Sequence, residues 1–132
     1  MLLPPFSSER TSATRPDLAM TERLAASVEA SGLIRNAEAA GDFGVILQKG
    51  DPDRGSLLVV VRNRGRFAAC LQRTLGMDGR YVWSLVGPEA DSPGEKVSQF
   101  LARQAGFDPD LWLIELDIAQ PERFIAETTS AG

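Results

Sequence analysis

Residues 56–63 read SLLVVVRN and are the strongest indication of the architecture in the sequence. Its aliphatic run from Leu57 to Val61 is apolar on both faces of a strand, because successive side chains point to opposite faces. A strand with one face in water alternates polar and apolar residues, whereas an unbroken apolar run is typical of a strand buried on both faces. The stretch therefore predicts a central strand of a sheet that is covered on both sides.

Three further segments around this run also have strand character. Residues 43–49 (FGVILQK) are β-branched in their middle, and residues 66–73 (RFAACLQR) and 80–86 (RYVWSLV) alternate between two faces. The links between the strands contain GDPDRG, NRG and GMDG, all of which are turn sequences. Because parallel neighbours need long crossover connections, these short links predict an antiparallel meander.

Helical patterns flank the four strands. Residues 21–40 carry apolar side chains every three or four positions and precede Gly41, which suits the left-handed position after a helix end. Residues 92–107 predict a second helix, residues 111–118 (LWLIELDI) a fifth strand, and residues 121–127 a last short helical turn. The fifth strand should pair inside that sheet or at one of its edges.

We therefore expect one α+β domain with a mostly antiparallel sheet of about five strands and two main helices. The expected order is α-β-β-β-β-α-β. The domain should span residues 20–126, after an irregular lead-in at residues 1–19 and before a C-terminal tail at residues 127–132.

The amino-acid composition limits which catalytic, metal-binding and disulfide sites the chain can form. The chain has no histidine and one cysteine, Cys70, which excludes histidine-containing triads, histidine-ligated metals and an internal disulfide. We expect no cofactor, no metal and an inert, packed Cys70. No apolar run approaches the roughly 20 residues of a membrane span, so we expect a cytoplasmic protein without a membrane partner.

The tripeptide Asp-Pro-Asp occurs twice, at residues 51–53 and 108–110. Four carboxylates could hold a hard cation if the two copies met in space. Each copy also has a complete local explanation as a turn: Asp51 can accept from backbone amides, and Pro109 prevents continuation of a helix. We interpret both copies as turns.

The charge is unevenly distributed along the chain. Residues 54–80 carry a net charge of +5, although the whole chain carries −4. Arginine beside aromatic side chains such as Phe67 and Tyr81 is one way to bind single-stranded nucleic acid. The alternative, which we favour, is a solvated hairpin tip whose arginines pair with acidic residues of the C-terminal half. The candidate binding surface consists of Arg62, Arg64, Arg66, Arg73 and Arg80.

Glu115 and Asp117 form a carboxylate pair on one face of the predicted fifth strand. Such a pair could exchange protons with a substrate. No third group completes a catalytic set, so we favour a structural role as partners for the arginines.

The segment DPDLWLIEL at residues 108–116 resembles DUF1491, a mainly alphaproteobacterial family catalogued as a domain of unknown function. LIRNAEAAG at residues 33–41 and the Gly-Asp turn that ends at Gly55 support the resemblance, which runs from about Leu24 to Phe124. The chain has Arg35-Asn36 and Gln48-Lys49 where the family often carries paired basic residues. The resemblance implies structural roles for the signature residues Gly50, Asp51, Asp108, Pro109, Asp110, Trp112 and Glu115.

The resemblance implies a domain boundary and brings no established activity. We therefore expect a small, non-catalytic binding or assembly module, with a homodimer or another protein as the open choice of partner. Nucleic-acid binding through the arginine hairpin is the alternative, and a carboxylate-based enzyme is the third hypothesis.

Overall fold

The structure is a computed structural model that describes residues 25–130 of the chain. The predicted lead-in at residues 1–19 and the predicted start of the domain at residues 20–24, which includes the first residues of the predicted helix 21–40, lie outside the described residues. The elements in chain order are α2 (Ala26–Ala39), β2 (Phe43–Gln48), β3 (Leu57–Asn63), β4 (Arg66–Leu75), β5 (Tyr81–Val86), α3 (Gly94–Phe107), β6 (Trp112–Asp117) and α4 (Pro121–Ser130). This is the expected α+β class, with a third helix.

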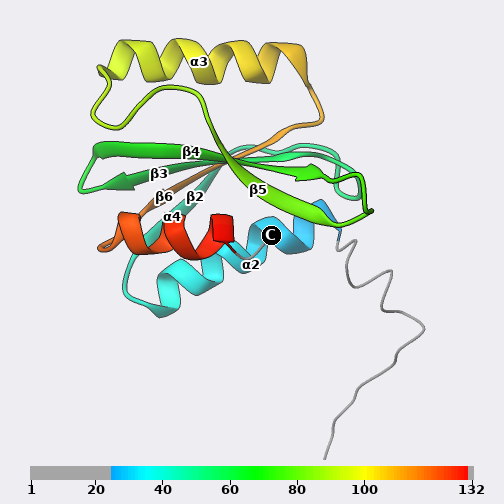
Figure 1. Cartoon of the computed structure of the whole chain (residues 1–132), viewed down its shortest axis with the longest axis horizontal. Coiled ribbons are helices and arrows are strands. Elements are labelled where there is room, and N and C mark those ends of the chain that lie inside the picture. Colours follow the sequence, from blue (N-terminus) through cyan, green and yellow to red (C-terminus); the bar gives the residue numbers. More distant parts are fainter. Residues whose placement is uncertain (1–24, 131–132) are drawn as a thin grey trace, which may run out of the picture.

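The sheet lies between two helical layers, with α3 over one face and α2 and α4 over the other (Figure 1). Leu57, Val59 and Val61 belong to the core on the side of α2 and α4. Leu58 and Val60 belong to the core on the side of α3. All five are at most 1% exposed, which confirms the prediction of a strand buried on both faces.

The strand order is β2-β6-β3-β4-β5. The predicted antiparallel meander holds for β3, β4 and β5. The predicted pairing of β2 with β3 is wrong, because β6 lies between them, antiparallel to β2 and parallel to β3. The link between β2 and β3 still reverses the chain direction, but it crosses the start of β6 and so spans two strand spacings, about 10 Å.

The last helix is longer than the sequence predicts. We expected a short helical turn and a tail from residue 127, whereas α4 continues to Ser130. Only Phe124 and Ile125 supply large apolar side chains, so the pattern on its own is weak. Both pack against the core beside α2, and this tertiary contact favours the longer helix.

Candidate functional site

The two Asp-Pro-Asp turns meet in space and form what we name the turn junction, residues 50–55 and 108–112. The Asp51 amide donates to the Asp110 carbonyl oxygen at 3.0 Å, and the Trp112 amide donates to the Ser56 carbonyl oxygen at 2.8 Å. A Cβ on Gly50 or on Gly55 would overlap the Asp110 carbonyl oxygen. Both positions therefore need glycine for close approach of two backbones.

Two carboxylates of the turn junction, those of Asp51 and Asp108, bond within their own turns. Asp51 Oδ1 accepts from the amides of Arg54 at 2.8 Å and Asp53 at 2.9 Å. These two bonds hold the pKa of the Asp51 carboxyl below its usual value. Asp108 Oδ1 accepts from the Asp110 amide at 3.0 Å. The interpretation of both copies as turns is confirmed, and in residues 25–130 no three carboxylate or thiol groups gather as metal ligands would.

Trp112 fastens the turn junction to the core. Its side chain is only 5% exposed and packs with Ile114 and Leu116 on the side of α2. Its indole Nε1 donates to the Asp51 carbonyl oxygen at 2.7 Å. The Ser27 amide, in the first turn of α2, donates to the Pro52 carbonyl oxygen at 3.0 Å. The signature residues thus join α2, β6 and the β2–β3 link.

Two arginines of the candidate binding surface have carboxylate partners in the C-terminal half of the chain. Arg62 Nε lies 3.3 Å from Glu115 Oε1, between neighbouring strands β3 and β6. Arg66 binds Asp91 through two bonds, Nε to Oδ1 at 2.5 Å and Nη2 to Oδ2 at 3.1 Å. This contact raises the pKa of the Arg66 guanidinium and lowers the pKa of the Asp91 carboxyl. The expected pairing with acidic residues of the C-terminal half is confirmed for both.

Asp117 shapes the hairpin tip between β3 and β4 rather than binding an arginine side chain. Its two carboxylate oxygens accept from the amides of Arg64 at 2.7 Å and Gly65 at 2.9 Å. Both acceptors face residues with positive φ, +53° at Arg64 and +83° at Gly65. These angles are those of a tight two-residue hairpin turn. The carboxylate offsets the strain at Arg64, which glycine would avoid.

Arg73 and Arg80 lie away from that hairpin tip. Arg73, at 4% exposure, is buried beneath α2 with its Nη1 at 3.4 Å from Glu29 Oε1. Its guanidinium stacks over the Tyr81 ring at 4.1 Å, and its Nε has no hydrogen-bond partner among the residues described. Arg80 is exposed in the β4–β5 turn at the other end of β4. The five arginines do not form one surface.

Cys70 is fully buried in the core on the side of α3. Burial raises the pKa of its thiol to about 12, so the thiolate that reacts with electrophiles is scarce at neutral pH. The expectation of an inert, packed cysteine agrees with this environment.

A hollow beside α4 was not predicted from the sequence. A cavity of about 650 Å³, which we name the apolar cavity, lies between α4, the start of β4 and the end of β5. Ala68 and Ala69 of β4 and Leu85 of β5 line it, opposite Ile125 and Ala126 of α4. The sequence signal is faint: two consecutive alanines in β4 leave room where larger residues would fill it.

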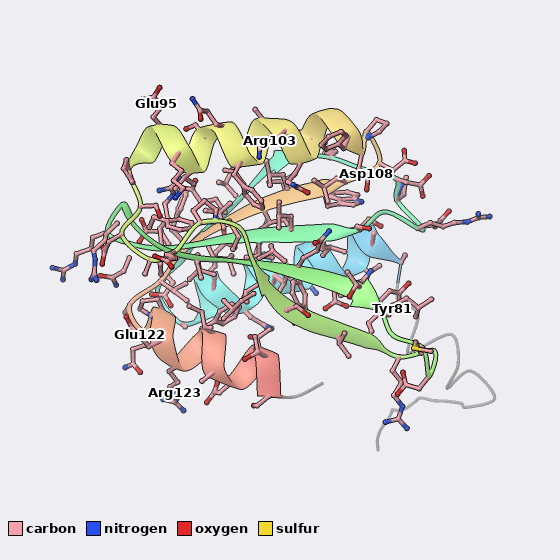
Figure 2. The ribbon with its side chains drawn as sticks, turned by 45° about the horizontal axis from the view of Figure 1, so that its top comes forward. Tyr81, Glu95, Arg103, Asp108, Glu122 and Arg123 are labelled. Carbon is pink, nitrogen blue, oxygen red and sulfur yellow. The ribbon has the colours of Figure 1, made fainter. Side chains whose placement is uncertain are left out.

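The rim of the apolar cavity is charged. Arg66, Glu89 and Glu122 are its charged lining residues, and Pro88 and Ala90 complete the wall that follows β5. Figure 2 shows Glu122 and Arg123 on α4 at one end of the molecule, and Asp108 of the turn junction at the opposite end. The signature residues and the cavity are therefore separate features.

The strand register explains why the cavity lies at this place. Pairing between β4 and β5 begins at Cys70 and Val86, so residues 66–69 of β4 extend beyond the end of β5. The chain then turns away through Gly87, and the Asp91 amide returns to donate to the Phe67 carbonyl oxygen at 3.0 Å. The space beside β4 is thus bridged by a loop instead of filled by a strand.

The comparisons with known proteins concern the whole domain. An NMR structure of a DUF1491 family protein from Caulobacter crescentus CB15 is 26% identical, with a TM-score of 0.66 over 75% of this chain and 89% of that chain. Protein Atu0922 from A. tumefaciens is 30% identical, with a TM-score of 0.57 over 72% of this chain and 86% of that chain.

A crystal structure of a DUF1491 family protein from Caulobacter crescentus CB15 is 27% identical, with a TM-score of 0.62 over 71% of this chain and 87% of that chain. No curated protein matches the sequence. The family model described as "Protein of unknown function (DUF1491)" matches residues 24–126, and the chain therefore belongs to the DUF1491 family.

Proposed function

We propose that this protein is a small, non-catalytic binding module whose binding site is the apolar cavity. The observation that carries the proposal is the cavity itself, about 650 Å³ in volume and lined mainly by apolar side chains of α4, β4 and β5. Ligand sites in proteins are commonly concave, largely apolar and within roughly 300–1,000 Å³.

Exposed apolar surface in the cavity favours the binding of a partner that would cover it. Leu85 on its floor is 60% exposed although it lies within a strand. Covering apolar surface is favourable by about 25 cal/mol per Å². A partner that covers Leu85 and contacts Ile125 would gain from burial without any rearrangement of the sheet.

The described side chains favour binding over catalysis. Glu115 is paired with Arg62, and Asp117 accepts from the amides of the hairpin tip. Both carboxylates therefore have structural roles. The lining of the cavity includes no serine, cysteine, lysine or tyrosine. A nucleophile with an adjacent base, the usual arrangement of covalent catalysis, is therefore not found among the lining residues.

Nucleic-acid binding through the arginine hairpin remains a prediction with less support. A backbone phosphate would have to displace Asp91 from Arg66 and Glu115 from Arg62. Arg73 is buried, which removes one positive charge from the candidate surface.

We also propose a cytoplasmic location. The single cysteine is buried and unpaired, which suits a reducing compartment. Within residues 25–130, no helix combines the length and apolar character that a membrane crossing requires.

A neutral apolar dye tests the proposed site. N-phenyl-1-naphthylamine should fluoresce on binding to the unmodified protein, and Ala68→Leu, which fills the floor of the cavity, should reduce the signal at least fivefold. Ala102→Leu makes the same change at an exposed position of α3, on the other face of the sheet, and should leave the signal unchanged. Thermal melts of both variants verify folding, and equal dye binding by all three proteins would refute the proposed site.

A further inference from the structure

The β4–β5 tip, residues 75–80, presents apolar side chains to water. Leu75 is 55% exposed and Met77 is 108% exposed, the highest value among the large hydrophobic residues described. The turn itself is well bonded: the Gly76 amide donates to the Arg80 carbonyl oxygen at 2.6 Å, and the Gly79 amide donates to the Gly76 carbonyl oxygen at 3.1 Å. The turn therefore holds Met77 outward on an ordered support.

The charges of the β4–β5 tip are not equivalent. Asp78 turns its carboxylate back to its own backbone, where Oδ1 accepts from the Arg80 amide at 3.0 Å. Arg80 is exposed and forms no ion pair with any residue in the described part of the chain. The tip thus offers a flexible thioether, an isobutyl group and a guanidinium.

The apolar cavity offers the complementary features. Arg66 on its rim is held by Asp91 through two bonds, so its charge is compensated locally. Glu89 and Glu122 are exposed rim residues, and neither is ion-paired within residues 25–130. Glu122 still lies within electrostatic reach of Arg66, but the rim carries three carboxylates, those of Glu89, Asp91 and Glu122, against this one arginine. An apolar floor with a rim of net negative charge suits an apolar group that carries a positive charge.

The two features lie at opposite ends of the β4–β5 pair. The tip follows Leu75 at the end of β4, whereas the cavity is lined by residues 66–69 at its start. Figure 2 shows Tyr81, next to the tip, on the opposite side of the molecule from Glu122. Because this part of the sheet is rigidly paired, the tip of one copy cannot enter its own cavity.

We infer that the occupant of the apolar cavity is the β4–β5 tip of a second copy of this chain, with Met77 on the alanine floor and Arg80 between Glu89 and Glu122. This inference rests on the proposed binding site and names its partner. The contact joins two different surfaces, so copies that add head to tail through it form open chains or a ring.

The contact should be weak and dependent on concentration. A tip of so few residues buries less than the roughly 1,200 Å² of a stable interface. We therefore expect association from about 100 μM upward, the range between micromolar and millimolar dissociation constants.

Two variants of the full chain test the inference by complementation. Met77→Asp removes the apolar tip and keeps the cavity, whereas Ala68→Leu fills the cavity and keeps the tip. In sedimentation velocity up to 1 mM, the unmodified protein should form dimers and larger species, and each variant alone should remain monomeric. An equimolar mixture should form dimers and nothing larger, because only one tip and one cavity remain competent.

Charge reversal and a matched control complete the test. Arg80→Glu should weaken association at least tenfold, and Glu122→Arg in the same chain should restore it. Phe107→Asp removes a different exposed apolar residue, 78% exposed at the end of α3, and should assemble like the unmodified protein.

The possible failures are distinguishable. Association that neither Met77→Asp nor Ala68→Leu changes would overturn the inference, because the contact would lie elsewhere. A protein that stays monomeric to 1 mM while the naphthylamine dye still binds would also overturn it and leave the cavity as a site for another ligand. If the unmodified protein neither bound the dye nor associated, both this inference and the proposed binding site would be refuted.

Discussion

At the end of the sheet where β3 and β6 begin, two turns meet backbone to backbone, whereas at the opposite end α4, β4 and β5 enclose a cavity of about 650 Å³. The turn junction holds most of the residues by which the chain resembles its family, and their backbone groups, the Asp51 and Asp108 carboxylates and the Trp112 indole bond within the junction. The apolar cavity holds no signature residue, its floor is apolar, and within residues 25–130 Glu89 and Glu122 on its rim form no ion pair. The signature residues therefore have a structural role, and the proposed binding site lies at the opposite end of the sheet.

The strongest test of this contrast is Trp112→Ala. Trp112 is 5% exposed and donates to the Asp51 carbonyl oxygen, so the change leaves a cavity and removes a hydrogen bond between the turn and the core. We expect a loss of about 3–5 kcal/mol in the free energy of unfolding, measured by chemical denaturation. Trp83→Ala, at a partly buried position of edge strand β5, should cost less. A loss below about 1 kcal/mol for Trp112→Ala would show that the junction does not anchor the core.

The next test adds one methyl group at the turn junction. In Gly50→Ala the new Cβ would overlap the Asp110 carbonyl oxygen, so two backbones must separate. We expect a loss of about 1–3 kcal/mol in the free energy of unfolding. Gly94→Ala is the control, because nothing lies within 4 Å of its Cβ position at the start of α3. If the two variants were equally stable, the junction would be looser than the structure indicates.

Acid should lower the stability of the protein through two carboxyl groups, Asp51 at the turn junction and Asp91 beside the apolar cavity. The two contributions should differ in their sensitivity to salt. The pKa of Asp51 is lowered by backbone amides and the pKa of Asp91 by Arg66, so each contributes stability above its usual value of 3.8. That stability is lost as the pH falls through the lowered pKa. Thermal melts between pH 2.5 and 6 should show a smaller acid-induced decrease in Asp51→Asn and in Asp91→Asn than in the unmodified protein.

Salt then separates the two carboxylates. About 1 M NaCl should shrink the difference between Asp91→Asn and the unmodified protein, because salt screens an exposed ion pair. The difference for Asp51→Asn should persist, because its oxygen contacts amide hydrogens directly. Equal salt dependence of the two variants would contradict the assigned causes.

The smallest expected effect is at the hairpin tip between β3 and β4. Changing Arg62, Arg64 and Arg66 together to Gln removes one exposed and one partly buried ion pair, so the melting temperature should fall by only a few degrees. A fluorescent single-stranded oligonucleotide should bind neither protein at low salt. Binding by the unmodified protein that weakens steeply with salt, and is lost in the triple variant, would favour the nucleic-acid hypothesis.

Local sequence patterns were sufficient for the elements and for the turn chemistry. The doubly buried strand, the helix end at Gly41 and the Asx-type turn at Asp51 each depend on a few neighbouring residues, and each is found in the structure. The place of β6 between β2 and β3 depends instead on competition between strands far apart in the chain. The link at residues 49–56 is long enough for either β3 or β6 to lie next to β2, so its length does not show which strand is the neighbour.

The candidate site was harder to predict for a related reason. Arg73 was placed on a surface because charged residues are usually exposed, whereas α2 covers it and Tyr81 stacks on it. The apolar cavity arises from a mismatch between β4, β5 and α4, and no single segment contains it. What could be inferred from the chemistry of the residues was that hairpin arginines pair with acidic residues of the C-terminal half, as Arg62 does with Glu115 and Arg66 does with Asp91.

The central place of β6 also has a consequence during synthesis. β2 pairs with β6 alone, joining Phe43 to Asp117, so it has no strand partner until the last quarter of the chain has left the ribosome. At about 5–20 residues per second, the apolar edges of β2 and β3 remain open for seconds. A nascent chain stalled before residue 112 should therefore engage a chaperone, and release of β6 should end that engagement.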